Sequence, residues 1–363
     1  SRKVFALSIL MGLVVTAIVV AGSLIFMDGL LDWMNVMDEH REASVAYITV
    51  IIVGLFFSII YNVLAANLRA IGDAYTPLIF LIISAVLNVV LDILCVKYMD
   101  MGVRGAAVAT VVSQAVSAVL CFGYTWKKYA FLHFNIKDFV PKKEFLKPML
   151  EGGLSMGLMN SLVSFGTLSL QTAINTLGTN TIVAHAATRK LTNLYMLPFS
   201  VLGTTMATYS GQNYGAGRYD RIRAGLKVSL GCSYIWCVIV LIASYTVCPY
   251  LIVAITDTNI REVIDTACLY QRFDTCFYLL VPTITILRNS LQGMGDHITP
   301  IFSSGLELVG KVLIAMLLTP VIGYWGIIVS EPIVWAVMVI PLIVSMVKRM
   351  KRAFVNEKIR NEK

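Results

Sequence analysis

The chain has 363 residues, of which 58% are hydrophobic and 14% are charged, and its formal net charge at pH 7 is +8. A soluble domain usually carries about 45–50% apolar and about 25% charged residues. The composition therefore excludes an ordinary soluble domain and predicts an integral membrane protein that contacts the lipid bilayer. In such a protein an excess of Lys and Arg is a topology signal, so we expect no nucleic-acid partner.

Apolar runs recur along the whole chain and are long enough to cross a bilayer. A hydrocarbon core about 30 Å thick needs about 20 apolar residues in each helix. The sequence is therefore predicted to be all-α, with ten transmembrane helices. They lie at about 5–27, 44–68, 77–98, 103–125, 152–176, 181–209, 224–254, 264–290, 298–320 and 323–347. An even number of spans places both termini on one side of the membrane.

Lys and Arg are divided unequally between the two sets of predicted loops. One set contains most of them, including the loop at 126–147 and the tail from Lys348 onward. The opposite set contains only Arg41, Lys97, Arg104 and Arg261. Because basic loops stay on the cytoplasmic side, we expect a multi-pass protein of the plasma (inner) membrane with both termini in the cytoplasm.

One sequence motif occurs twice. Residues 68–77 read LRAIGDAYTP and residues 291–300 read LQGMGDHITP, and both stretches join two predicted spans on the cytoplasmic side. Gly72 and Gly295 allow a tight turn, Asp73 and Asp296 can cap the following helix, and the closing prolines suit its first turn. Two unrelated helix–loop–helix turns are the alternative, but the double G-D-x-x-T-P favours a repeat.

The repeat extends through four spans and sets the predicted domain organisation. At an offset of 221 to 223 residues, spans one to four align with spans seven to ten in the same direction, as in transporters whose halves move about a central cavity. Spans five and six have no counterpart, so we expect two further helices before residue 1. The expected parts are an N-terminal lobe remnant at 1–130, a cytoplasmic linker at 131–147, a C-terminal lobe at 148–350 and a basic cytoplasmic tail at 351–363.

These motifs together resemble the multidrug and toxic compound extrusion (MATE) family. The similar stretches are RAIGDAYTP with LNVVLD, then GVRGAAVATVVSQ, GQNYGAGRYDR and RNSLQGMGDHITP. The resemblance implies twelve helices in two pseudo-symmetric six-helix lobes around a central cavity, of which this chain contains ten. It also implies export of amphipathic, often cationic compounds, driven by inward movement of Na⁺ or H⁺ as the coupling ion and without a cofactor.

Two polar residues interrupt the third predicted span. Asn88 and Asp92 are four residues apart, so they share one helix face. A charged side chain at the bilayer centre costs about 2.5–3.5 kcal/mol and is therefore a functional candidate by default; a hydrogen bond between helices is the alternative. Thr110, one helix further on, can direct its hydroxyl to the same place.

The resemblance assigns these three residues to a cation site. Prokaryotic members of the family bind a cation with an Asn, an Asp, a Thr of the next helix and an Asp of the first helix. Asn88, Asp92 and Thr110 match the first three, with Asp92 as the Na⁺ ligand if the protein is sodium-coupled. The fourth ligand would lie before residue 1. Three oxygen donors are fewer than a hard cation requires, so we expect part of a site.

The second copy of the repeat carries different residues at the same positions. Lys311 replaces Asn88, Ala315 replaces Asp92 and Glu331 replaces Thr110, while Glu307 lies one turn before Lys311. We expect the Lys311 ammonium group to fill the equivalent pocket, held by Glu307 or Glu331 as a fixed ion pair. The alternative is that Lys311 faces the central cavity and contacts substrate or protons.

Other polar residues within the spans are candidates to line a substrate cavity: Gln114, Asn160, Gln171, Asn175, His185 and Arg189. For His185 and Arg189, helix packing is an equal alternative. Some family members use a Glu in span five and an Asp in span eight for coupling. Span five has no internal acid here, and Asp274 beside Arg272 is expected to be interfacial or structural, near the outer end of its span.

No nucleotide-binding or catalytic pattern is present in the sequence. GQNYGAGRYDRIR lacks the G-x-x-x-x-G-K-[ST] spacing, and no H-E-x-x-H or nucleophile–His–Asp arrangement occurs, so we expect no enzyme. The preferred interpretation is a monomeric cation-coupled antiporter that exports amphipathic drugs or toxic metabolites. A lipid-linked oligosaccharide flippase, with an Arg-rich cavity, is one alternative. A membrane-embedded enzyme or a non-transporting scaffold is another.

Overall fold

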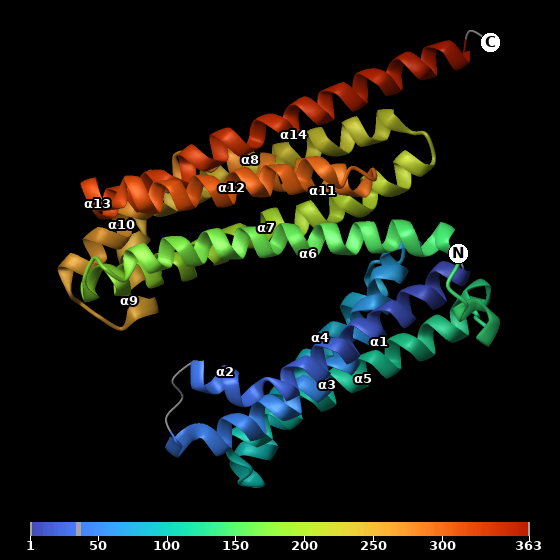
Figure 1. Cartoon of the computed structure of the whole chain (residues 1–363), viewed down its shortest axis with the longest axis horizontal. Coiled ribbons are helices and arrows are strands. Elements are labelled where there is room, and N and C mark those ends of the chain that lie inside the picture. The colour runs from blue at the N-terminus through green and yellow to red at the C-terminus, as the bar shows by residue number, and fades with distance from the viewer. Residues whose placement is uncertain (1, 34–37, 362–363) are drawn as a thin grey trace. The chain divides into compact units, whose positions relative to one another are not determined.

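The computed structural model describes residues 2–33 and 38–361, and almost all of them lie in helices (Figure 1). The predicted all-α fold is confirmed, since no strand occurs in these two ranges. The chain divides into two compact units, residues 1–149 and 150–363. Each unit builds its own apolar interior.

The first unit contains five α-helices, three short helical stretches of other types and the start of a sixth α-helix. They are α1 (Arg2–Ile25), α2 (Met27–Trp33), α3 (Asp38–Ala70), α4 (Tyr75–Asp92), the π-helical stretch η1 (Ile93–Tyr98), α5 (Gly102–Lys128), η2 (Ala130–Leu132), η3 (Ile136–Phe139) and the start of α6 (Lys143–Ile174). The order follows the first four predicted spans. The predicted linker at 131–147 contacts the first helix. Asp138 of η3 forms an ion pair with Arg2 of α1, with Arg2 Nε 2.8 Å from Asp138 Oδ2.

Small residues let the helices of the first unit approach closely. A Cβ atom on Gly54 of α3 would lie 2.2 Å from Val111 Cγ2 of α5, so only glycine fits at this crossing. Ala107 and Ala109 of α5 are fully buried. Helices in a bilayer associate through such small-residue contacts, because lipid gives them little hydrophobic reason to pair. The first unit therefore packs as a membrane bundle does.

The second unit continues with the rest of α6 and eight more helices. These are α7 (Thr179–Gly215), α8 (Tyr219–Thr246), α9 (Cys248–Thr256), α10 (Arg261–Thr275), α11 (Leu280–Gly293), α12 (Ile298–Leu317), α13 (Thr319–Ile322) and α14 (Tyr324–Asn361). Figure 1 shows α7, α8, α11, α12 and α14 running along one common direction. The largest apolar core of this unit joins residues of α7, α8, α10, α11 and α14.

The crossing of α7 and α11 is the tightest helix contact in the second unit. A Cβ atom on Gly293 would lie 2.1 Å from the Ala207 carbonyl oxygen, and one on Gly203 would lie 2.8 Å from Thr285 Cγ2. A Cβ atom on Gly211 would lie 3.0 Å from the Gly293 carbonyl oxygen. These glycines bring two backbones into contact.

The described residues include seven helices that are long and apolar enough to cross a membrane. They are Arg2–Ile25, Ser44–Ala70, Tyr75–Tyr98, Gly102–Lys128, Tyr219–Thr246, Ile298–Leu317 and Tyr324–Arg352. Predicted spans five and six form the long helices α6 and α7, which are richer in polar residues. Predicted span eight is divided into α10 and α11 by the turn at 276–279.

One predicted boundary was wrong, for a local reason. Span seven does not continue to 254, because α8 ends at Thr246 and Pro249 starts α9 at its first turn. The π-helical stretch η1 forms the end of span three, which ends at Tyr98 as predicted. The predicted tail is helical through Asn361, since residues 348–361 contain no Gly or Pro and are rich in Lys, Arg and Glu, which are good helix formers.

Candidate functional site

The two copies of the G-D-x-x-T-P motif have the same backbone geometry. Gly72 and Gly295 have φ values of +96° and +77°, a region that favours glycine. Asp73 Oδ1 accepts the Thr76 backbone N–H at 3.1 Å, and Asp296 Oδ1 accepts that of Thr299 at 3.1 Å. The expected capping of α4 and α12 is therefore confirmed, and both turns hold a carboxylate at the same point.

Each of these carboxylates is also paired with a cation from a helix distant in sequence. Lys128 Nζ of α5 lies 3.8 Å from Asp73 Oδ2, and Arg349 Nε of α14 lies 3.2 Å from Asp296 Oδ2. Lys128 and Arg349 are 221 residues apart, the same offset that aligns the later part of the repeat. The sequence repeat thus extends to a tertiary ion pair.

The predicted cation site of the first unit lies where α4 meets α5. Asn88 Nδ2 is 3.4 Å from Thr110 Oγ1, and the Thr110 hydroxyl also donates to the Ala106 carbonyl at 3.0 Å. The Ser84 hydroxyl donates to the Ser113 carbonyl at 2.8 Å and fixes the two helices one turn away. The structure therefore brings Asn88 and Thr110 together, as their helix positions require.

Asp92 is the last residue of α4 and directly precedes the π-helical stretch η1. Widening of an α-helix to a π-helix is rare and frequent at functional sites. Asp92 Oδ1 is buried, and no hydrogen-bond partner for it occurs among the described residues. Such an orphaned acceptor costs free energy unless a proton or cation occupies it.

The side chains of this site suit a monovalent cation or a proton better than a strongly bound metal ion. Asn88 donates through its Nδ2 to Thr110 Oγ1, which leaves its Oδ1 as an acceptor, and Asp92 follows Asn88 by one helical turn on the same face. The described part of the chain has no group of three His, Cys, Asp or Glu side chains that could hold a metal ion. A single carboxylate with neutral oxygens fits a monovalent cation or a proton.

The equivalent place in the second unit is filled by a chain of buried ion pairs. Lys311 Nζ lies 2.9 Å from Glu307 Oε1 and 3.9 Å from Glu331 Oε1. Glu307 Oε2 lies 3.6 Å from Arg288 Nη2, and Glu331 Oε1 accepts from Arg189 Nη1 at 2.9 Å. We call these five residues the buried ion network. Both carboxylates contact two cations, so Lys311 has both of the partners that the sequence offered as alternatives.

The aliphatic part of Lys311 packs against α6. A Cβ atom on Gly166 would lie 3.1 Å from Lys311 Cδ and 3.4 Å from the Cα atom of Leu308. The Lys311 side chain is only 4% exposed. It is therefore held between α6 and its own helix.

Asp274 was expected to be an interfacial or structural group. The residue is fully buried, and neither of its carboxylate oxygens has a hydrogen-bond partner among the described residues. It belongs to α10, where Gln271 and Thr275 are buried on the same helix. Arg272 lies two residues before Asp274, so the two side chains do not share a helix face, and Arg272 donates to the Ser244 carbonyl.

The remaining polar candidates lie in different surroundings. His185 is buried, with Nδ1 3.1 Å from the Tyr324 hydroxyl and its ring edge-on to Tyr270. Gln171 and Asn175 bond to each other at 2.9 Å on α6. Gln114 is partly exposed and Asn160 is exposed. His185 and Arg189 therefore make contacts inside the second unit, whereas the other four lie nearer its surface or that of the first unit.

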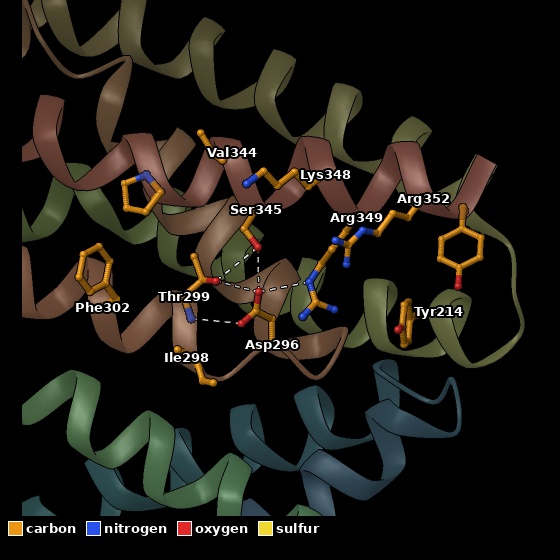
Figure 2. Close-up of a pocket in the computed structure, with 12 residues that line it drawn as sticks. Tyr214, Asp296, Ile298, Thr299, Phe302, Val344, Ser345, Lys348, Arg349 and Arg352 are labelled. Atoms are coloured by element: carbon orange, nitrogen blue, oxygen red, sulfur yellow. Dashed lines mark hydrogen bonds and ion pairs between the residues drawn. The ribbon is translucent and has the colours of Figure 1, made fainter. Parts of the chain in front are cut away.

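A pocket of about 670 Å³ at the Asp296 end of α12 was missed by the sequence analysis. It is lined by residues of α7, α8, α12 and α14, with Asp296 at its base (Figure 2). Burial raises the pKa of the Asp296 carboxyl, but hydrogen bonds from Thr299 and Ser345 and the Arg349 charge outweigh it and lower the pKa. The repeat predicted that Asp296 caps α12, but nothing in the sequence predicted that α14 lies beside Asp296.

Comparison with known proteins identifies the family. The sequence matches the MatE family over residues 1–94 and 156–321. The chain belongs to the MatE family. The probable multidrug resistance protein YpnP of Bacillus subtilis (strain 168) is 31% identical over 176 residues, which cover 48% of this chain and 39% of YpnP. YoeA, another probable multidrug resistance protein of that organism, is 25% identical and the alignment covers 90% of this chain and 72% of YoeA.

MatE relatives and structures agree with this assignment. The multidrug export protein MepA of Staphylococcus aureus (strain MSSA476) is 25% identical, over 87% of this chain and 67% of MepA. An outward-facing multidrug resistance MATE family transporter of the MOP superfamily superposes with a TM-score of 0.89 at 22% identity, over 97% of this chain and 79% of that chain. This MatE chain therefore has a fold seen in membrane transporters, and its relatives are transporters and not enzymes.

Proposed function

We propose that this chain forms the larger part of a secondary antiporter. It would export amphipathic, often cationic drugs or toxic metabolites in exchange for inward Na⁺ or H⁺. The names of the relatives support export of drugs. The observation that carries the coupling is the buried Asp92 Oδ1, which has no partner among the described residues, lies one helical turn from Asn88 and directly precedes a π-helical stretch. A coupling cation or proton that binds and is then released needs an acceptor of this kind.

The proposed mechanism requires only that the two ligands prefer different conformations. Cation binding at Asp92 would favour an outward-facing state with low affinity for the drug, which is then released outside. Drug binding from the inside would favour the state that releases the cation. Coupling between two sites is typically about 1–3 kcal/mol and is reciprocal, and a ligand shifts an equilibrium only by its difference in affinity for the two states.

The second unit is proposed to take no part in cation exchange at the equivalent position. There the buried ion network places Lys311 where Asn88 lies in the first repeat, and Glu307 and Glu331 neutralise it. A fixed ammonium group would repel a second cation. The two repeats would then serve different purposes, with coupling in the first unit.

The proposed membrane arrangement follows the sequence repeat. It has ten spans of an expected twelve and both termini in the cytoplasm. The two lobes are proposed at 1–130 and 148–350, with substrate bound near the bilayer midplane. The protein is proposed to be a monomer without a nucleic-acid partner. The direct support in this chain is the matched pair of motif turns, each closed by its own ion pair.

A lipid-linked oligosaccharide flippase is the second candidate, because the second unit contains Arg189, Arg288 and Lys311 within its helices. Pyrophosphate recognition needs guanidinium groups that are free to form bidentate contacts. All three cations are already paired with Glu307 or Glu331. This pairing favours the drug antiporter.

The test is transport by the full-length protein in sealed vesicles. Efflux of a fluorescent lipophilic cation should depend on an imposed Na⁺ or H⁺ gradient, and Asp92→Asn should abolish that dependence. The matched control is Asp257→Asn, since Asp257 follows α9 outside the proposed site. Undiminished gradient dependence in Asp92→Asn would falsify the site assignment. Absence of cation efflux together with movement of a lipid pyrophosphate would favour the flippase.

A further inference from the structure

The pocket above Asp296 combines a strongly cationic side with an apolar side. Its cationic side is Lys348, Arg349 and Arg352 of α14, which we call the basic cluster. Lys348 and Arg352 are four residues apart and therefore share a helix face. Asp296 is the only carboxylate among the lining residues, so the side chains around this space carry a net charge of about +2.

The single carboxylate does not neutralise the basic cluster. Asp296 already accepts the Thr299 backbone N–H and hydroxyl, the Ser345 hydroxyl and Arg349 Nε–H. Lys348 and Arg352 make no ion pair or hydrogen bond within the described part of the chain. Arg349 donates to Asp296 through its Nε, and neither of its Nη groups forms a hydrogen bond or ion pair with any described residue. The cluster can therefore donate several charge-assisted hydrogen bonds to an added anion.

Figure 2 shows the guanidinium groups of Arg349 and Arg352 in the space between α14 and Asp296, with Tyr214 at one margin. Tyr214 and Tyr219 meet edge to face with ring centroids 5.7 Å apart. Tyrosines are enriched at the level of lipid headgroups, because they have an apolar ring and a polar tip. The rim of the pocket thus has the character of a membrane–water boundary.

The apolar side of the pocket is exposed on helices long and apolar enough to cross a membrane. Ile298 is 81% exposed, Phe302 is 58% exposed and Val344 is 44% exposed; we call these three residues the apolar strip. They lie at the ends of Ile298–Leu317 and Tyr324–Arg352, where the basic residues of α14 begin. A ligand that satisfies both sides must therefore be anionic at one end and hydrocarbon at the other.

We propose that this pocket binds the headgroup of an anionic phospholipid. The phosphate diester lies among the basic cluster, and the acyl chains run along the apolar strip into the bilayer. Arg349 presents its two Nη groups as a fork that suits phosphate oxygens, while its Nε retains Asp296. Basic pockets between transmembrane helices are known to bind such headgroups, and an anionic leaflet supplies them. The inference is independent of the coupling ion and of the exported substrate.

Lipid binding would strengthen the connection between α14 and the start of α12. The bound phosphate would contact α14 through the basic cluster while Arg349 keeps its link to the cap of α12. Anionic lipid should therefore stabilise the folded protein, because anything that binds only the native state does so. A zwitterionic lipid with the same acyl chains lacks the net charge and should bind more weakly.

The test is a titration of the purified full-length protein in neutral detergent micelles, with the thermal unfolding midpoint as the readout. Dioctanoyl phosphatidylglycerol should raise the midpoint in a saturable way, whereas dioctanoyl phosphatidylcholine at equal concentration should raise it far less. Inorganic phosphate forms a separate arm, which tests whether the acyl chains matter. We expect no shift with inorganic phosphate at concentrations where the lipid saturates.

The decisive variant is Lys348→Gln with Arg352→Gln, which leaves the Asp296–Arg349 pair intact. Each basic side chain near a membrane surface contributes about five-fold in affinity, so we expect about thirty-fold weaker binding of phosphatidylglycerol. The matched control is Arg221→Gln with Lys227→Gln on α8, which removes the same charge from exposed residues outside the pocket. That control should bind the lipid as the unmodified protein does.

Several results would overturn the inference. These are equal stabilisation by the two lipids, equal stabilisation by inorganic phosphate, and unchanged lipid affinity in the pocket variant. Equal loss in the α8 control would replace the pocket by a general charge effect. If the double variant does not fold, Lys348→Gln and Arg352→Gln alone should each weaken binding about five-fold, since both residues are exposed and their replacement disturbs little. Because the readout is lipid binding, failure of drug transport does not affect it.

Discussion

The contacts of the buried ion network predict that replacing Lys311 by Met destabilises the folded protein less than replacing Glu307 by Gln. The variant Lys311→Met removes a buried charge, yet both carboxylates keep a cation. Glu307 still has Arg288 at 3.6 Å, and Glu331 still has Arg189 at 2.9 Å. The loss is then close to one charge-assisted hydrogen bond, which is about 1.5–3 kcal/mol. We expect Lys311→Met to fold and to unfold at a moderately lower temperature.

The variant Glu307→Gln should cost more, although it also removes one charge. Arg288, whose side chain is only 11% exposed, would keep only a hydrogen bond to Ser303 at 3.4 Å. Lys311 would be 3.9 Å from its remaining carboxylate, Glu331. Two buried cations would thus be left poorly compensated, and breaking a buried pair in this way costs about 3–5 kcal/mol. Lys311→Glu should be worst, since it places a third carboxylate beside two others.

The assay is unfolding of the purified protein in one detergent, by temperature and by denaturant, for the three variants. Lys143→Met and Glu144→Gln serve as matched controls, because both residues are exposed in the first turn of α6. Controls should lie within about 0.5 kcal/mol of the unmodified protein. Equal destabilisation by Lys311→Met and Glu307→Gln, or normal folding and transport of Lys311→Glu, would refute the reasoning.

Three further predictions concern other parts of the molecule. Thr110→Ala should raise the half-saturating concentration of the coupling cation at least ten-fold, because loss of a supporting group costs about 10–100-fold in metal affinity. Gly293→Ala should destabilise by about 1–3 kcal/mol, since its Cβ would lie 2.1 Å from the Ala207 carbonyl oxygen. Asp296→Asn should lower the unfolding temperature at neutral pH by a margin that disappears in acid. The lowered pKa of Asp296 makes its contribution complete above the usual value of 3.8 and lost as the pH falls through the folded-state pKa.

The first two of these predictions have a control within the chain, and the third has a defined contradicting result. Thr125→Ala removes a buried hydroxyl that donates to the Cys121 carbonyl on the same helix as Thr110, and it should leave the cation dependence unchanged. Gly305→Ala adds a Cβ with nothing within 4 Å, so stability should be kept or improved. A constant difference between Asp296→Asn and the unmodified protein from pH 6 down to pH 3 would contradict the assigned pH dependence.

The sequence predicted the features that depend on neighbouring residues. The helical class follows from long apolar runs, and the matched turns follow from Gly72 and Gly295, whose positive φ suits glycine. The caps made by Asp73 and Asp296 also depend on residues only three positions away. Likewise the contact between Glu307 and Lys311 joins residues four apart on one helix. Local geometry and spacing are enough for all of these.

The tertiary structure alone decided which distant groups meet. Arg189 reaches Glu331 across 142 residues, and Arg349 reaches Asp296 across 53. The burial of Asp274 and the pocket beside Arg349 likewise depend on the rotation and crossing of α10, α12 and α14. The crossing of α12 and α14 depends on close contacts such as Gly310 against Val334, where an added Cβ atom would lie 2.7 Å from Val334 Cγ2. The sequence by itself determined the helices, their turns and the repeated unit. Only packing determined which charges are paired, because helix periodicity specifies a face but not the neighbour that covers it.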